Sequence, residues 1–461
     1  MSAMGTMAQR AGECWLRAMF PLLACAALPW ADAVEAAANG SISYVREVAP
    51  ILQRHCNGCH HPGKQKGDVD LTSVRAMARA GRHGVPVVAG KPEESVMLLE
   101  VKGSEPAMPK EGGRLSEVQV AVLERWIREG ALDDTPPPPG PPTEPPGYEA
   151  PPVLGAMDWS SDGRWLAVAG RGEVLVMDAV RMIRLHRLLG APRKIEALRF
   201  SPDGRSLAVA GGEPGVRGIY QRWLVDGWAR ETHAEVGHDV LMALDWHPDG
   251  KRVATGSPDR MVRVLSATDG TVLVAGQVHA DWVLGVAWVD DGRRLVSGGR
   301  DRSLRLLEEG TLRLLDVVNR EGEPVVRLAR RPVSEQVAFA GAESRARLYQ
   351  AFVRPPASDP GQDPNHVREF DAWPGGATAL AFSPDGQWIA TAGAPSGVSV
   401  QRVEGGGRVA RMEGHGGVVF GLAFDAKGER LATAGIEGRL RVYSLPGGAL
   451  LTNWVPVEVG R

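Results

Sequence analysis

The sequence has little of what marks several common classes of protein. Only four of its 461 residues are cysteines, and aromatic residues make up 6% of the chain. The formal net charge is -2 and the charged fraction is 23%, so the chain has neither the positive excess of a nucleic-acid-binding protein nor the composition of a disordered one. These values indicate a soluble globular protein, and charge alone identifies no partner.

The beginning of the chain has the features of an export signal. In residues 1–33, two arginines precede an apolar run at 18–30, and Ala31 and Ala33 supply the small residues that a signal peptidase requires. The run is shorter than the about 20 residues that span a membrane, so we expect no transmembrane span in the mature chain. We expect cleavage after Ala33 and a periplasmic or otherwise exported protein. The alternatives are an uncleaved anchor and a lipid anchor on Cys25.

Cleavage would leave the mature protein with two cysteines, Cys56 and Cys59, because Cys14 and Cys25 would be removed. A disulfide across two intervening residues would stabilise the fold little. Together with His60, the pair forms the motif C-x-x-C-H, which is typical of covalent attachment of one c-type haem through two thioethers, with the histidine as iron ligand. A zinc site is less favoured, since structural zinc takes four protein ligands and the sequence offers no second Cys/His pair.

Residues 41–133 show helical periodicity at both ends. Apolar residues recur at helical spacing over 45–52 and again over 118–127, where Ser116 is the predicted N-cap and Gly130 the predicted end. We therefore predict a small all-α domain. Residues 134–152 are rich in proline, which favours an extended polyproline II conformation and a stiff linker.

The remaining chain, 153–461, contains an internal repeat. Seven similar apolar runs begin at Leu166, Leu207, Val253, Leu295, Val337, Ile389 and Leu431. Successive runs are 41 to 52 residues apart, close to the roughly 40 to 45 residues of a four-stranded propeller blade, and the longest interval holds a proline-rich insert at 354–366. Asp-Gly hairpin turns precede several runs. We predict an all-β, seven-bladed β-propeller, because blades that stack in a closed ring cover one another's faces.

Aromatic residues recur at matching positions just before these turns, where we expect them to fill the core: Trp159, Phe200, Trp246, Trp288, Phe382 and Phe424. The sequence does not decide how the ring closes. Residues 449–455 could complete the last blade, or a strand from the N-terminal side of Val153 could do so.

The repeat region resembles the WD-repeat family, which folds as a β-propeller. In this family a histidine and an acidic residue of the same blade form a structural hydrogen bond. The resemblance implies such pairs at His238 and Asp259, His279 and Asp301, and His415 and Glu437. The tryptophan usual in the third strand is missing, and Leu265 and Tyr443 stand in its position.

Residues 42–132 are similar to the small cytochrome c domains of planctomycete-type exported proteins. The similarity rests on "YVREVAPILQRHCNGCHHPGKQKGDVDLTS", "GVPVVAGKPEES" and "AMPKEGGRLSEVQVAVLERWIREGA", which occur in the family's order. The resemblance implies that Met108 is the second axial ligand of the iron. His83, His61 or an open site are the alternatives, whereas Met77 and Met97 lie in apolar stretches where a packing role is expected.

These observations favour a monohaem c-type cytochrome that transfers electrons, with the propeller as docking scaffold for a redox partner protein. Ligation by histidine and methionine leaves no free coordination position, so no catalytic residue is predicted. An alternative is an interaction scaffold in which haem serves as a redox or ligand sensor. A haem enzyme is less favoured because the propeller lacks phosphate-loop, H-E-x-x-H and G-x-S-x-G motifs.

Overall fold

The computed structural model describes residues 41–61, 64–110, 113–135, 142–319, 322–343, 345–352 and 363–460. They fall into two compact units, one before the proline-rich stretch and one after it. The predicted signal peptide, with Cys25, lies outside the described residues. Within the described residues, no helix combines the length and the apolar character needed to cross a bilayer.

The first unit consists of short helices joined by loops. Its α-helices are α2 (Ala49–His55), α3 (Val74–Met77), α4 (Val96–Val101) and α5 (Glu117–Arg128), and its shorter helical turns are η1 (Tyr44–Val48), η2 (Lys66–Asp68) and η3 (Pro92–Glu94). β1 (His60–His61) and β2 (Lys64–Gln65) form a two-stranded sheet. The predicted all-α character is thus not clearly shown, since glycines and prolines between the helices favour loops.

The last helix of this unit begins and ends as its sequence predicts. The Ser116 hydroxyl accepts the backbone N–H of Gln119 at 3.3 Å, and the Gln119 side chain accepts the backbone N–H of Ser116 at 2.9 Å. This reciprocal pair is a capping box, which satisfies two of the N–H groups left free at a helix start. Gly130 follows the helix with a φ of 103°, a left-handed conformation that glycine adopts without strain.

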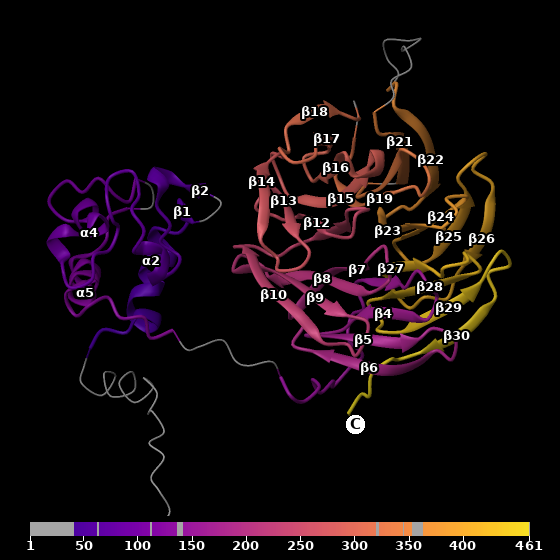
Figure 1. The fold of residues 1–461 in the computed structure, drawn as a ribbon, viewed down its shortest axis with the longest axis horizontal. Helices are drawn as coiled ribbons and strands as arrows, with labels where there is room; N and C mark the ends of the chain where they lie inside the picture. Colours follow the sequence, from indigo (N-terminus) through magenta and orange to yellow (C-terminus); the bar gives the residue numbers. More distant parts are fainter. Residues whose placement is uncertain are drawn as a thin grey trace, which may run out of the picture. The chain divides into compact units, whose positions relative to one another are not determined.

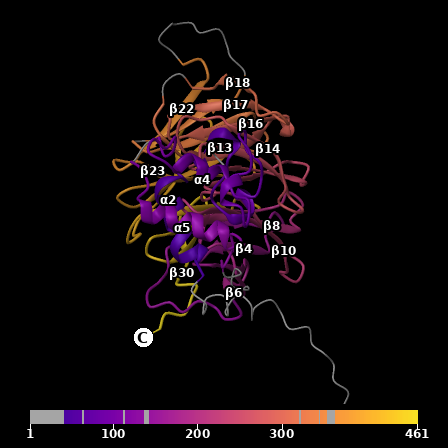
Figure 2. The same ribbon diagram turned by 90° about the vertical axis from the view of Figure 1, so that its left-hand side faces the viewer.

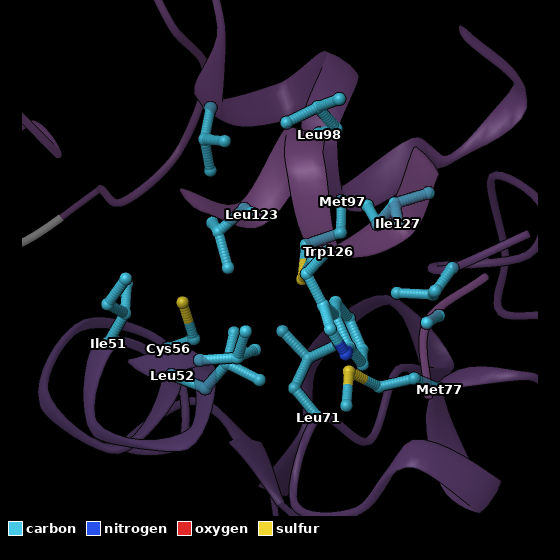
Figure 3. Close-up of a cluster of buried hydrophobic side chains, with 14 of the residues drawn as sticks. Ile51, Leu52, Cys56, Leu71, Met77, Met97, Leu98, Leu123, Trp126 and Ile127 are labelled. Carbon is cyan, nitrogen blue, oxygen red and sulfur yellow. The ribbon is translucent and has the colours of Figure 1, made fainter. Parts of the chain in front are cut away.

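The apolar stripe of α5 supplies much of the core of the first unit. Leu123, Trp126 and Ile127 are buried there together with Leu52 of α2 (Figure 3). The Trp126 indole N–H donates to the carbonyl oxygen of Leu132 at 3.0 Å, so its one polar group is satisfied although the ring is buried. The two predicted terminal helices therefore pack their apolar faces into one common core.

The second unit is a ring of seven four-stranded antiparallel sheets, which confirms the predicted seven-bladed β-propeller (Figure 1). In each blade the four strands follow one another along the chain. The first three blades contain β3 (Met157–Trp159), β4 (Trp165–Ala169), β5 (Glu173–Asp178) and β6 (Ile183–Leu189); β7 (Lys194–Phe200), β8 (Ser206–Glu213), β9 (Arg217–Leu224) and β10 (Arg230–Gly237); and β11 (Ala243–Trp246), β12 (Arg252–Gly256), β13 (Met261–Ser266) and β14 (Val272–Gln277).

The next four blades have the same order of strands. They contain β15 (Val283–Val289), β16 (Arg294–Gly299), β17 (Leu304–Glu308) and β18 (Leu314–Val317), with the turn η4 (Asp290–Gly292); β19 (Val325–Arg330), β20 (Gln336–Gly341), β21 (Arg345–Gln350) and β22 (His366–Ala372); β23 (Ala377–Phe382), β24 (Trp388–Gly393), β25 (Val398–Arg402) and β26 (Arg408–Met412); and β27 (Val419–Phe424), β28 (Arg430–Gly435), β29 (Leu440–Ser444) and β30 (Leu450–Trp454).

The repeated apolar runs of the sequence form the second strand of each blade. In β4, β12 and β28 the residues after the first are all buried. A strand covered on both faces has a continuous apolar sequence, whereas a strand with one wet face alternates. The outermost strands are exposed at many more positions, as in β6 and β14. The propeller was therefore recognisable mainly from its second strands.

The chain closes the ring without exchanging a strand between its two ends. β30 pairs with β29, so residues 449–455 complete the seventh blade, and this resolves the alternative left open by the sequence. At the junction with the first blade, the backbone N–H of Leu154 donates to the carbonyl oxygen of Gly435 at 3.1 Å. The C-terminus lies near β30 and β6 (Figure 1, Figure 2), where the backbone N–H of Gly460 donates to the carbonyl oxygen of Tyr148 at 2.9 Å.

Candidate cofactor site

The first unit contains a cavity of about 430 Å³. Its lining includes all four residues predicted to bind haem, namely Cys56, Cys59, His60 and Met108. Cofactor pockets usually measure about 300 to 1,000 Å³ and are largely apolar, and apolar side chains such as Val101 form part of this wall. The fold therefore brings together residues that are up to 52 positions apart in the sequence.

The two cysteines lie on a turn that directly follows α2. Cys56 is the C-terminal cap of that helix, and the backbone N–H groups of Cys59 and His60 both donate to its carbonyl oxygen at 3.1 Å. Both thiols are free, and the Cys56 side chain is directed into the core, beside Leu52 of the same helix (Figure 3). The tight turn thus keeps all three side chains of the motif at one wall of the cavity.

The surroundings of Cys56 suit a neutral sulfur. Burial raises the pKa of the Cys56 thiol to about 11, so this group is neutral near pH 7. Within the residues that the structure describes, no group of three or more histidine, cysteine and acidic side chains has the arrangement of a metal site. A thioether is also neutral, so these surroundings suit the expected attachment of haem at Cys56.

The imidazole of His60 is suited to ligate a metal. Its Nδ1 atom is buried and has no hydrogen-bond partner within the described part of the chain. Burial is the main cause that lowers the pKa of this side chain, and the resulting neutral imidazole is the form that binds metals. The backbone is fixed, since the carbonyl oxygen of His60 accepts the N–H of Leu71 at 2.9 Å. The residues present therefore fit a haem iron.

Three side chains of this cavity could provide the second axial ligand. Met108 follows α4, and its backbone N–H donates to the carbonyl oxygen of Glu100 at 2.9 Å. Met97 and His83 line the same cavity, although Met97 also belongs to the buried core. Met77 is fully buried in that core, which agrees with its expected packing role. A further imidazole of the lining, that of His55, contacts the Gln119 side chain at 3.3 Å, so Met108, Met97 and His83 are the candidates, and an open site stays an alternative.

Cationic side chains at the cavity were not identified from the sequence. Lys66, Arg82 and Lys110 all line it, and Arg82 forms a solvent-exposed ion pair with Asp68 at 3.5 Å. Haem carries carboxylate groups, so basic residues in its pocket complement its charge. The only sequence signal was proximity to predicted ligands, since Arg82 precedes His83 and Lys110 follows Met108 by two positions. These three basic residues could not be recognised from the overall charge of the domain, because a sum over all residues does not show which of them lie together.

In the propeller, one of the three implied histidine–acid pairs forms a direct hydrogen bond. His279 Nδ1 lies 2.9 Å from an oxygen of Asp301, and its Nε2 lies 2.8 Å from the hydroxyl of Ser297. His279 is buried, so both ring nitrogens need partners. This network links the loop before β15 to the turn between β16 and β17, and its structural role is confirmed.

The other two implied pairs are arranged differently. His238 Nδ1 and Asp259 Oδ2 are 3.9 Å apart, while the guanidinium of Arg263 lies 3.2 Å from the other oxygen of Asp259. His415 Nε2 is 3.0 Å from the hydroxyl of Thr433, and the acid of its blade pairs with an arginine instead. An arginine stands four residues after the acid in all three blades and pairs with it, including Arg305 with Asp301 at 3.4 Å, so the arginine alone does not distinguish the direct pair from the other two.

Comparison with known families agrees with both halves of this description. Residues 56–112 match the family described as Planctomycete cytochrome C. Residues 231–266, 270–307, 364–398 and 406–444 match the family described as WD domain, G-beta repeat. Both resemblances are confirmed. A comparison with curated proteins gave no match to the chain.

The cytochrome c match begins at Cys56 and extends past Met108, so it spans the four predicted haem-site residues. A cytochrome c segment implies haem binding. The four matched WD repeats lie within a ring of seven blades, and a propeller of this kind suggests protein–protein interaction. The two matches thus suggest a haem-binding unit followed by a unit that interacts with proteins.

Proposed function

We propose that this protein is an exported monohaem c-type cytochrome that transfers electrons, and that its propeller docks the redox partner protein. Residues 41–133 would form the cytochrome c domain, 134–152 the linker and 153–461 the docking scaffold. One observation carries the proposal: Cys56, Cys59, His60 and Met108 line a single cavity of cofactor size. The export signal predicted over residues 1–33 supports a periplasmic or otherwise exported location.

The cysteines would attach the cofactor covalently. Each thiol would add across one vinyl group of haem, so that the C=C double bond becomes a C–C single bond and the S–H bond is replaced by a C–S and a C–H bond. No electron is gained or lost in this addition. The raised pKa of Cys56 keeps its thiol protonated near pH 7, and both cysteines line the same cavity.

The axial side chains would set the redox properties. Bound haem supplies an iron that exchanges one electron. A neutral His60 imidazole on one side and the Met108 thioether on the other would raise the reduction potential and leave no coordination position for a substrate. Lys66, Arg82 and Lys110 would pair with the carboxylates of the cofactor and so orient it. These roles favour electron transfer over catalysis.

Covalent attachment can be tested by expressing the full chain, with its N-terminal segment, in a host that contains a cytochrome c maturation system. We expect the purified protein to begin at Val34 and to have the added mass of one haem after denaturation. A variant with Cys56→Ala and Cys59→Ala should lose this mass, while Met77→Leu, in the same core, should keep it. Wild-type protein without covalent haem would contradict the proposal, and a lipid on Cys25 would revise only the location.

A further inference from the structure

The propeller encloses a second cavity, which is independent of the cytochrome c unit. Along the centre of the ring lie a wider space of about 620 Å³ and a narrower one of about 80 Å³. Arg199, Leu244, Val286 and Leu328 line both spaces, so the two are continuous. Residues of all seven innermost strands contribute to the walls, and the channel is therefore a product of the closed ring.

One arginine interrupts a ring of aromatic residues around the wider space. In six blades an aromatic residue ends or nearly ends the first strand and pairs with the second residue of the second strand, as Phe200 pairs with Leu207. In the fifth blade the corresponding residue, paired with Val337, is Arg330. A charged residue at a position that otherwise fills the core costs stability unless its charge is used. The presence of Arg330 at a position that is aromatic in the other six blades makes the channel a candidate binding site.

Two arginines of the channel lack a carboxylate partner among the described residues. Arg327 and Arg330 both belong to β19, and the hydrogen bonds of their guanidinium groups go to backbone carbonyls, of Val326 at 3.1 Å and of Ser334 at 3.2 Å. Arg199, the third arginine of the channel, lies 3.4 Å from an oxygen of Asp158. A guanidinium group has five N–H donors, so most donors of Arg327 and Arg330 are available to a ligand.

The acidic groups of the channel are already engaged. Asp158 accepts the backbone N–H of Phe200 at 2.7 Å, and Asp245 accepts that of Trp288 at 2.8 Å, so each links its blade to the next. Glu196 forms an ion pair with Lys194 at 2.6 Å. The three carboxylates equal in number the three arginines that line the channel, and Lys194 lies outside this lining, so the charge that matters is the local one at Arg327 and Arg330. Burial is the main cause that raises the pKa of Asp245 to about 6, while the charges of Arg199 and Arg330 oppose this shift, so the negative charge of Asp245 decreases only as the pH falls toward 6.

The positive charges also act on one another. Burial lowers the pKa of Arg327, and the nearby charge of Arg199 lowers it further, while Glu196 opposes both. Like charges in a narrow, weakly polar channel attract a counter-ion strongly, because water screens them poorly there. A bound anion would satisfy the available donors and relieve the repulsion between these two arginines.

We propose that the central channel of the propeller binds a small oxyanion, a phosphate or a carboxylate, through Arg199 and Arg330, which both line the wider space, with Arg327 in the adjoining narrower space. The planar fork of a guanidinium matches the paired oxygens of both groups, which a lysine ammonium does not. The site is distinct from the haem site and its existence does not depend on the proposed electron transfer. It would give the docking scaffold a small-molecule ligand of its own.

The test is isothermal titration calorimetry of the full chain at low ionic strength, with inorganic phosphate and with succinate as probes. We expect saturable binding of one anion per chain, which Arg330→Gln weakens at least tenfold. Arg330→Lys should bind more weakly than wild type, because it keeps the charge and loses the fork. Arg402→Gln, at an exposed arginine of β25, is the matched control and should bind as wild type does.

The preference between the two probes identifies whether the natural ligand is a phosphate or a carboxylate, and either result supports the site. Melting curves establish that each variant is folded, and wild-type protein should melt at a higher temperature in the presence of the bound anion. If Arg330→Gln does not fold, the proposal is tested by whether Arg330→Lys binds the anion more weakly than the wild type does. Failure of both probes to bind saturably, or equal loss of binding in Arg402→Gln, would overturn the proposal.

Discussion

Glu173 and Arg187 form a two-pronged ion pair inside the first blade. Arg187 Nε lies 2.6 Å from Oε2 of Glu173, and its Nη2 lies 2.6 Å from Oε1. The Glu173 side chain is 0% exposed, and it also accepts the hydroxyl of Tyr148 at 2.7 Å. Since Tyr148 precedes the first strand of the propeller, this buried carboxylate ties the entering chain to the ring.

Removing the arginine of this pair should destabilise the propeller strongly. Arg187→Ala leaves the Glu173 carboxylate buried without its cation, and such a loss costs about 3 to 5 kcal/mol of unfolding free energy. Arg313→Ala is the control, because Arg313 pairs with Glu308 through two hydrogen bonds at an exposed position, where an ion pair contributes about 0 to 1 kcal/mol. Urea unfolding measures both. Equal losses in the two variants would show that burial of Glu173 does not matter.

Met108→Ala should alter the haem more than any other methionine substitution in the first unit. Loss of a thioether ligand lowers the reduction potential, and we expect a change on the order of 0.1 V within the about 0.8 V range that axial ligands span. Redox titration monitored by absorption gives the value. Met97→Leu tests the other thioether of the cavity, and Met77→Leu controls for core packing. An unchanged potential in Met108→Ala would direct attention to Met97 or His83.

Trp126→Ala should unfold the first unit more easily without changing the haem spectrum. The ring is 1% exposed and stacks on Tyr44 at a centroid distance of 5.6 Å, so its removal should cost about 3 to 5 kcal/mol. Trp126 is not one of the described residues that line the cavity, so we expect the haem spectrum of the variant to be the same as that of the wild type. Denaturant unfolding and absorption spectra of the folded variant test both parts. A large spectral shift would instead indicate contact with the cofactor.

His415 should make the propeller sensitive to mild acid. Burial, together with the charge of Arg441, lowers the pKa of His415 to about 4, whereas an unfolded histidine has a pKa of about 6.5. Between these values the unfolded state binds more protons than the folded state. The stabilisation is therefore complete above about pH 6.5 and is lost as the pH falls toward 4, by up to roughly 3 kcal/mol.

Chemical denaturation at about pH 7 and about pH 5 measures this dependence. His415→Gln can still bond to Thr433 but does not titrate, so its stability should fall less over the same interval. Asp245, with a pKa raised to about 6, acts in the opposite direction, because its protonation favours the folded state as the pH falls. The wild type and the His415→Gln variant both contain Asp245, so the difference between their losses of stability is due to His415. Equal losses of stability in the two proteins would contradict the role assigned to His415.

Features that depend on short stretches of chain were predictable from the sequence. The seven second strands are buried on both faces and so keep a continuous apolar pattern, and Ser116 caps α5 through residues three positions apart. The detailed geometry of side-chain networks was not. His279 and His415 both bond through Nε2 to a hydroxyl of the second strand, but only His279 also bonds directly to the acid of its blade, and the spacing of histidine and acid cannot show this.

The same distinction applies to the haem site. Cys56, Cys59 and His60 lie within five consecutive residues, so their grouping needs no fold, and the structure adds that Met108 lines the same cavity. Lys66, Arg82 and Lys110 come together only through loops that carry no periodic pattern. The aromatic positions were predicted as core fillers, but the meaning of Arg330 appears only when the seven blades are aligned by their strand pairing.

Closure of the ring without strand exchange has a mechanical consequence. Each sheet is made of consecutive residues, so only noncovalent contacts join the seventh blade to the first. These include the hydrogen bonds of Leu154 with Gly435 and of Gly460 with Tyr148. Neighbouring blades elsewhere are also joined by the covalent chain, which this one junction lacks. Under tension or heat the circle should therefore part first between its seventh and first sheets and uncoil as an open, curved stack.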